Sequence, residues 1–455
     1  MTRILLCAAA GVAARLLVAW AAADAGLFAD MVQYQERARH LAETGALWPD
    51  ALRGPGYPLL LAAAYRAFGE SLWIARVVNA LVGGALVVAT GVLARAAGAG
   101  RRAWVASAIV AVYPALLLSS VYLMPEGLYT LLVVTALALV RHRSAGFAVA
   151  AGAVSGAAMV TRSVGLALTA TPVAVWLWAW WRGEVEASRA VARVAMFVAA
   201  CAVVLAPWLL FTTRVAGGPM LDATSGVNLL LGNHPGATGR LVLTDEASLR
   251  EQYVVGAVTP ADGNARAIAA GVSWAMEHPH QWVRLAGRKL GYLFGLEGRE
   301  HAWVYGHGYF GQRRGVTVTV WALLLVASFP LLCIGAAVRF VRGPRPASPA
   351  LVAIGAMLTA TAALHVISFG ESRFHLPLVP LLAVVASLGG ATIRRGHGAA
   401  TSGRPVAGGR PVARVIVAAV VLGALAVAWA GQWGELRGQG QRLQAPDGWR
   451  SAPPY

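Results

Sequence analysis

Long apolar runs, separated by short loops that carry arginine, recur from the first residues of this chain to about residue 430. A helix that crosses a bilayer needs about 20 mostly apolar residues, and many of the runs approach that length. Hydrophobic residues make up 58% of the 455 residues and charged residues only 13%, whereas charged residues form about a quarter of a soluble domain. The chain is therefore predicted to be an all-α integral membrane protein.

We expect about eleven transmembrane helices. The run from residue 147 to 181 is either one long helix or two, and we divide it because Arg162 lies at its middle, where a charge is costly in lipid. The first run is too long for the apolar region of a cleaved signal peptide and is expected to be an anchor. The predicted spans are 4–23, 72–94, 103–120, 126–140, 146–161, 164–181, 190–211, 316–338, 350–369, 376–393 and 414–430.

The formal charge of +18 comes almost entirely from arginine, since Lys289 is the one lysine in the sequence. Such a charge often indicates a nucleic-acid partner, but here the arginines lie mainly in short loops between apolar runs. This distribution follows the positive-inside rule and predicts a cytoplasmic N-terminus, with the lipid bilayer as partner and no nucleic acid. The three cysteines lie within apolar runs, which favours buried thiols over disulfides or metal ligands.

Two segments of different composition, 24–71 and 212–315, fall outside the membrane in this topology, on the extracytoplasmic side. Both are richer in Asp, Glu, His, Asn, Trp and Tyr than the spans, and amphipathic helices are predicted at 34–40, 57–68 and 265–294. Residues 394–413 form a Gly/Pro/Arg-rich cytoplasmic linker, which 414–455 follows as a last transmembrane helix and outer tail.

Two acidic residues stand at predicted outer helix ends, Asp30 after the first span and Glu126 at the start of the fourth. Carboxylates from distant positions that meet at one interface could supply a general base and an electrostatic or metal partner. A divalent ion held by Asp30 and Glu126 is therefore a candidate cofactor, although nothing in the sequence requires one. The alternative for each acid is a helix-start role favoured by the helix dipole.

Basic residues near the same interface are candidates for binding a phosphate. Arg53 precedes a turn, Gly54-Pro55-Gly56, that would hold its side chain at headgroup level, and its alternative is a snorkelling Arg at a membrane re-entry turn. Arg373 lies in a very short connection and either pairs with Glu371 or faces a cavity. Lys289 and Arg162 complete this basic set, and Tyr34, Tyr57, Glu371 and Asn233 are the candidates for the substrate pocket.

Taken in order, these motifs resemble those of the polyprenol-phosphate-dependent glycosyltransferases of the GT-C superfamily, in particular its protein-mannosyltransferase-like and aminoarabinose-transferase-like branch (glycosyltransferase family 39-like). The resemblance covers residues 1 to about 393. Asp30 is followed by Met31, where this family often has a second acid, and this difference shifts attention to Glu126. The motifs are Asp30 with Tyr34, Arg53-Gly54-Pro55-Gly56-Tyr57-Pro58, Ala75-Arg76-Val77-Val78-Asn79, Tyr113-Pro114, Pro125-Glu126, Thr161-Arg162-Ser163, Gly232-Asn233-His234-Pro235 and Glu371-Ser372-Arg373-Phe374.

The resemblance implies a GT-C-like helix bundle and an enzyme of the cell envelope. Such an enzyme moves a hexose or pentose from a polyprenyl phosphate to a lipid, glycan or protein acceptor, with inversion at the sugar. It implies that Asp30 deprotonates or orients the acceptor, on the extracytoplasmic face of a bacterial-type inner membrane. Cations would then meet the charge that develops on the leaving lipid phosphate.

Two other classes of membrane protein share the composition. A transporter would favour acidic residues in the middle of spans, and a polymerase or ligase of lipid-linked glycans would favour an outer loop dominated by Arg and His. Neither pattern accounts for an early Asp at the outer end of the first span.

Overall fold

The computed structural model describes residues 1–298, 316–342, 348–389 and 411–444. Over these ranges the chain is helical, with no strand. The α-helices are α1 (Thr2–Ala21), α2 (Asp30–Thr44), α3 (Gly56–Phe68), α4 (Leu72–Ala96), α5 (Ala103–Val112), α6 (Pro114–Leu118), α7 (Glu126–Val140), α8 (Ala145–Thr161), α9 (Ala170–Trp181), α10 (Ala187–Ala216), α11 (Ser225–Leu231), α12 (Leu243–Tyr253), α13 (Pro260–Glu277), α14 (Pro279–Leu293), α16 (Val316–Arg342), α17 (Pro349–Ile367), α18 (Val379–Ser387) and α19 (Pro411–Gln444). Three 3-10 helices join them: η1 (Gly100–Arg102), η2 (Ser163–Thr169) and η3 (Ser372–Leu378).

Seven helices in the described ranges are long and apolar enough to cross a membrane, and three further apolar helices are shorter. The predicted all-helical, multi-pass membrane fold is confirmed, but the predicted number of eleven spans is not. The predicted span 103–120 is broken, because α5 ends at Val112 and α6 begins at Pro114. Proline lacks the amide hydrogen that would continue the helical ladder, so the helix stops before it.

Two expectations about helix continuity are tested directly. The division of 147–181 is confirmed, since α8 ends at Thr161 and the extended Arg162 (φ −149°) separates it from η2. The single helix expected over 265–294 is instead two helices. Helix α13 ends at Glu277 and α14 starts at Pro279, again at a residue that cannot donate a backbone hydrogen bond.

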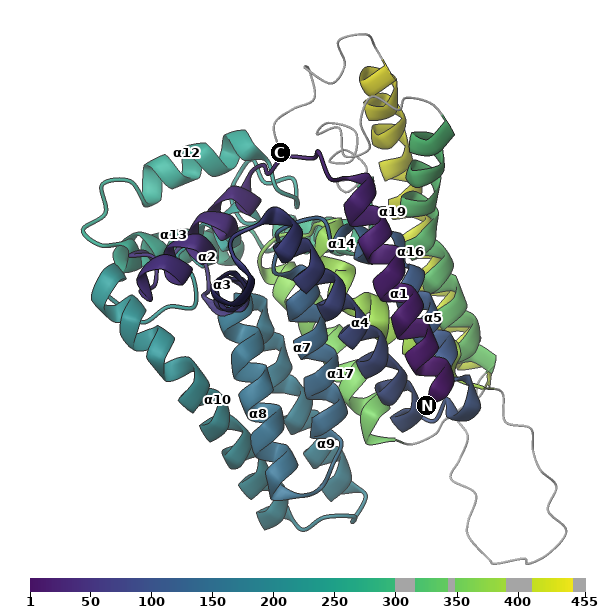
Figure 1. Cartoon of the computed structure of the whole chain (residues 1–455). Helices are drawn as coiled ribbons and strands as arrows, with labels where there is room; N and C mark the ends of the chain where they lie inside the picture. Colours follow the sequence, from purple (N-terminus) through teal and green to yellow (C-terminus); the bar gives the residue numbers. More distant parts are fainter. Residues whose placement is uncertain (299–315, 343–347, 390–410, 445–455) are drawn as a thin grey trace, which may run out of the picture.

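The helices are arranged as a bundle that is covered at one end (Figure 1). Helices α1, α4, α5, α7, α8, α9 and α10 run lengthwise, while α2, α3 and α11 to α14 gather at the end opposite the N-terminus. We call the described residues of the two predicted outer segments, 24–71 and 212–298, the helical cap. Its two parts are joined where the Ala223 amide donates to the Ala51 carbonyl at 2.8 Å. The predicted linker residues 394–410, the tail residues 445–455 and residues 299–315 lie outside the described ranges.

A buried arginine inside the bundle joins α1 to α5, the helix that ends before Pro114, through hydrogen bonds. Arg15 in α1 is 1% exposed, and its guanidinium donates to the carbonyls of Val110 (3.2 Å), Ala111 (3.2 Å) and Gly11 (3.1 Å). The carbonyls of Val110 and Ala111 lie in the last turn of α5, where the break before Pro114 leaves them without helical partners. Gly83 makes room for the side chain, since a Cβ there would lie 2.1 Å from Arg15 Nε.

Candidate active site

Asp30 is the first residue of α2, and the residue before it in the chain has a strained backbone conformation. The preceding residue, Ala29, has a φ of +47°, a conformation that residues with a side chain rarely adopt. Strain of this kind persists only where the surrounding structure holds it, and it gathers at functional sites. The position at the helix start also points the carboxylate toward the positive end of the α2 dipole.

The turn that follows Arg53 explains how this arginine reaches Asp30. A Cβ on Gly54 would lie 2.2 Å from the Val160 carbonyl oxygen, and one on Gly56 would lie 2.3 Å from the Thr161 hydroxyl. Only glycine allows the turn to pack so closely on the end of α8. From there the Arg53 guanidinium donates to Asp30 Oδ1 at 2.6 Å.

Glu126 and Arg162 form the second ion pair of the site. Glu126 is the first residue of α7, and its Oε1 accepts a hydrogen bond from the Arg162 guanidinium at 2.5 Å. The Glu126 side chain is only 8% exposed, and its other oxygen, Oε2, has no hydrogen-bond partner in the described part of the chain. Arg162 reaches this position because its extended conformation between α8 and η2 turns the side chain inward.

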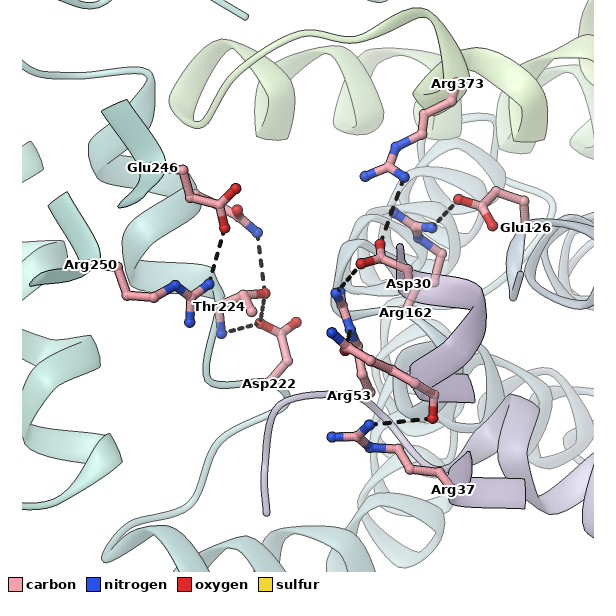
Figure 2. Close-up of polar contacts among 12 residues, drawn as sticks. Asp30, Arg37, Arg53, Glu126, Arg162, Asp222, Thr224, Glu246, Arg250 and Arg373 are labelled. Atoms are coloured by element: carbon pink, nitrogen blue, oxygen red, sulfur yellow. Dashed lines mark hydrogen bonds and ion pairs between the residues drawn. The ribbon is translucent and has the colours of Figure 1, made fainter. Parts of the chain in front are cut away.

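Arg373 on η3 completes the cluster (Figure 2). Its Nη1 lies 3.9 Å from Asp30 Oδ2, at the outer limit of an ion pair, and its guanidinium stacks over the Phe374 ring. The Arg162 guanidinium lies over the same ring at 5.7 Å. Two cations thus lie close to the same aromatic ring.

A cavity opens beside these groups, between α7, η2, α17 and η3. Its lining combines charged residues with apolar and neutral polar side chains. Arg373 is therefore one of the residues that line a cavity. The lining residues are Glu126, Tyr129, Arg162, Val164, Thr361, His365, Arg373, Phe374 and Pro377.

The charge balance of the cluster is positive. Three guanidinium groups, from Arg53, Arg162 and Arg373, meet the two carboxylates of Asp30 and Glu126. These five side chains by themselves have a formal charge of +1, in a partly buried place where electrostatic interactions are stronger than in water. Such a site favours a ligand with one or more negative charges.

Of the four residues predicted for the substrate pocket, the two tyrosines pack beside Asp30 without lining the cavity. The Tyr34 ring meets the edge of Tyr57 at 5.6 Å, and the Arg53 guanidinium lies over Tyr34. Burial raises the pKa of the Tyr34 phenol to about 12, so this group is neutral at physiological pH. Tyr57 is 1% exposed and donates to Asn79 Oδ1 at 3.0 Å. Both tyrosines therefore pack next to the site and do not line its cavity.

The cap loops are held against the end of α17 and the start of η3 by three polar residues, Lys289, Asn233 and Glu371. The Lys289 ammonium is fully buried and donates to Asn233 Oδ1 (3.0 Å) and to the carbonyl of Val366 (2.9 Å), and burial lowers its pKa to about 8. Glu371 Oε1 accepts from the Leu241 amide at 3.1 Å. A phosphate could reach Lys289 only if these bonds were exchanged. We therefore expect these three residues to support the cap.

The structure also gives roles to two residues that the sequence motifs contained but did not explain. Arg76 is 2% exposed and donates to the carbonyls of Ala23 and Ala25, at the end of α1. Asn79 accepts from Tyr57 and donates to the Tyr122 carbonyl at 3.1 Å. Charged or amide residues within an apolar helix are the signal that could have identified them.

Comparison with known protein families agrees with this arrangement. Residues 31–216 match the model of the dolichyl-phosphate-mannose-protein mannosyltransferase family. The resemblance to the GT-C superfamily is confirmed. The matched segment contains Arg53, Glu126 and Arg162, and it begins one residue after Asp30. No curated protein matches the chain at the level of sequence.

The solved structures that are similar to this chain at low sequence identity include the following two. One is the crystal structure of ArnT from Cupriavidus metallidurans bound to undecaprenyl phosphate, with 19% identity, a TM-score of 0.47, and coverage of 83% of this chain and 58% of that one. The other is the archaeal oligosaccharyltransferase AglB from Archaeoglobus fulgidus in complex with an inhibitory peptide and a dolichol-phosphate, with 16% identity, a TM-score of 0.49, and coverage of 98% and 58%. The chain thus matches 58% of the length of each.

The close packing of the Arg53 turn yields a first prediction. Replacing Gly54 by Ala should place a methyl group within 2.2 Å of a backbone oxygen of α8, so the turn must move and take Arg53 away from Asp30. A misplacement of about 1 Å can lower turnover by about 100-fold, and overpacking typically destabilises by about 1–3 kcal/mol. Turnover and thermal unfolding of the purified protein measure the two effects.

Gly146→Ala is the matched control for this prediction. Gly146 lies near the start of α8, and a Cβ there would meet nothing within 4 Å. This variant should behave like the wild type. A Gly54→Ala protein with wild-type turnover would show that the turn does not set the position of Arg53.

Proposed function

We propose that this protein is a membrane glycosyltransferase that moves a sugar from a polyprenyl-phosphate donor to a hydroxyl or amine of an acceptor, with inversion at the sugar. The observation that carries the proposal is the meeting of Asp30, Glu126, Arg162 and Arg373, from four distant segments, beside a cavity at one end of an apolar bundle. The family match over 31–216 supports the same reaction class. The acceptor is a lipid, a glycan or a protein.

In the proposed reaction, the acceptor group attacks the first carbon of the donor sugar from the face opposite the phosphate. The bond from that carbon to the phosphate oxygen breaks, and the oxygen keeps the electron pair. Asp30 takes the proton of the attacking group or orients that group. Glu126 lines the cavity, and its second oxygen is buried and has no hydrogen-bond partner in the described ranges, so we propose that it accepts a hydrogen bond from a hydroxyl of the bound donor sugar.

The cations of the site fit the charge change of this reaction. A sugar phosphodiester carries one negative charge, whereas a released phosphate monoester carries about −1.5 to −2 at neutral pH. The extra charge develops as the bond breaks, and Arg373 and Arg162 are already in place at the cavity. Groups fixed in this way stabilise the transition state more than the bound donor.

The donor set at Asp30 and Glu126 does not fit a divalent ion. Each carboxylate is paired with a guanidinium, and the described residues contain no group of three or more His, Cys, Asp or Glu placed to hold a metal. We therefore propose that the arginines supply the positive charge, and no step of the proposed reaction passes through a metal.

Chelation tests this assignment. We expect protein purified and assayed with an excess of EDTA to keep its turnover, because the arginines do not depend on an added ion. Addition of Mg²⁺ or Mn²⁺ after removal of the chelator should change the rate little. Loss of turnover in EDTA that is restored by one of these ions would overturn the assignment.

We further propose that the helical cap lies on the extracytoplasmic side of a bacterial-type inner membrane, because the arginines of the short loops lie at the other end of the bundle. Ala46 in the cap and Ala145 at the opposite end are both exposed. In a Cys-free background, we expect an impermeant thiol reagent added to intact cells to label Ala46→Cys but not Ala145→Cys. The reverse pattern would invert the topology.

A direct assay tests the function itself. Purified protein is incubated with a panel of polyprenyl-phosphate hexoses and pentoses in the presence of membrane extract as the source of acceptor. Released polyprenyl phosphate is then measured. Release that depends on the protein and on one class of sugar supports the proposal, whereas no release from any donor would contradict it.

A further inference from the structure

A buried polar network lies two residues beyond Arg373, outside the site described above. Glu297 and His375 are both fully buried, and His375 Nε2 lies 3.1 Å from Glu297 Oε1. The Tyr113 hydroxyl donates to the same oxygen at 2.7 Å, and the Ser328 hydroxyl donates to Glu297 Oε2 at 3.4 Å. The network thus joins η3 to the break between α5 and α6, to α16 and to the segment after α14.

Hydrogen bonds and ring stacking fix the orientation of His375. Its Nδ1 lies 2.9 Å from the Leu293 carbonyl, which can only accept, so this nitrogen carries a hydrogen. The Phe329 ring stacks flat against the imidazole, with 3.6 Å between the ring centroids. Breaking a polar contact buried in this way is costly, because it leaves buried groups without hydrogen-bond partners, so the network resists displacement.

The last helix, α19, reaches the segment that carries Glu297. Gln432 accepts from the Leu296 amide at 2.8 Å and donates to the Gly291 carbonyl at 2.9 Å. Trp429 donates to the Phe294 carbonyl at 2.8 Å. These backbone groups lie in the last turn of α14 or just after it, where the helical hydrogen-bond pattern ends, so α19 supplies the bonds that hold residues 291–297 in place.

We propose that α19 is a positioning element of the active site, which sets the Arg373 guanidinium through residues 291–297 and the buried Glu297–His375 pair. The path is short, because Gln432 holds Leu296, Glu297 holds His375, and His375 lies on the same 3-10 helix as Arg373. This role goes beyond the family match, which ends at residue 216. The part that concerns transfer rests on the proposed function.

Hydrogen exchange tests the path without any need for activity. We expect Gln432→Ala to increase amide exchange in residues 368–378, because Glu297 is then less firmly held. Val427→Ala on the same helix is the control, since Val427 is 76% exposed and takes no part in these bonds. Equal exchange in this segment for the wild type and both variants would overturn the proposal.

Donor kinetics test the consequence for Arg373. Gln432→Ala should lower kcat/KM for the donor by up to about 100-fold, the effect of a misplaced binding group. In an Arg373→Ala background the same substitution should have a much smaller effect, because the residue through which it acts is gone. If the two residues acted independently, Gln432→Ala would lower kcat/KM by the same factor, within about twofold, in the wild type and in the Arg373→Ala variant. That result would overturn the proposal.

The two experiments separate this inference from the proposed function. If the wild type releases no polyprenyl phosphate from any donor, the proposed function is contradicted, and the exchange experiment still decides whether α19 holds η3. Glu297→Gln provides a second variant at the centre of the path. It replaces the carboxyl group by an amide at nearly constant volume, and we expect it to raise exchange in residues 368–378 as Gln432→Ala does.

Discussion

Asp30→Asn should lower sugar transfer by about 10²–10⁴-fold, the usual contribution of a general base. The amide oxygen can still accept the hydrogen bond from Arg53, which the carboxylate now receives at 2.6 Å, so the helix start should remain in place. The lost property is the ability to take a proton. Turnover at saturating donor and acceptor, with thermal unfolding measured in parallel, distinguishes a chemical effect from a structural one.

Asp50→Asn is a matched control for this substitution. Asp50 also pairs with an arginine at 2.5 Å in the same part of the cap, but its partner is Arg37, which is not one of the three arginines of the cluster. This variant should keep nearly all of the wild-type turnover. If Asp30→Asn transferred sugar at the wild-type rate, Asp30 would be only a partner for Arg53 and Arg373.

Arg373→Ala should lower kcat/KM for the donor by about 10²–10³-fold, the effect of removing one fixed donor from a site where negative charge develops. Arg373→Lys should restore only part of this loss, because lysine keeps the charge but not the planar pair of N–H donors. The measurement is the dependence of turnover on donor concentration for each variant. The loss should appear in both the apparent affinity and the maximal rate.

Arg250→Ala provides the comparison for this series. Arg250 lies across the cap from Arg373 in Figure 2 and pairs with Glu246 at 3.0 Å within α12. Its removal should leave donor kinetics unchanged. Unchanged kinetics in Arg373→Ala would instead show that the positive charge of Arg162 is sufficient for the leaving phosphate.

The sequence predicted the parts of this site that depend on where each helix begins or ends. Asp30, Glu126 and Arg373 were all placed at one end of the bundle, because apolar length and loop charge determine which end of each span faces which side. The structure brings these residues together as expected. The position of Arg162, between two helices of the divided run, follows from the same argument.

The sequence could not predict which side chains would pair, since pairing depends on how helices far apart in the chain pack. The contacts of Arg53 with Asp30 and of Lys289 with the end of α17 could not be predicted in this way, and the expectation that both residues bind a phosphate stays a prediction. The Glu297–His375 pair was missed for the same reason, as its members are 78 residues apart. The break at Pro279 was visible in the sequence, but the amphipathic pattern on both sides of it suggested one helix.

The buried Arg15 has a consequence for how the protein enters the membrane. On insertion scales, an arginine at the centre of a helix disfavours transfer into the bilayer by about 2.5–3.5 kcal/mol. Two of the three carbonyls that accept its hydrogen bonds belong to Val110 and Ala111, about 95 residues later in the chain. During synthesis the first helix is therefore left with an unmatched charge until the fifth helix emerges. We infer that α1 settles stably in lipid only when α5 joins it, so that biogenesis of the bundle is cooperative from its first hundred residues onward.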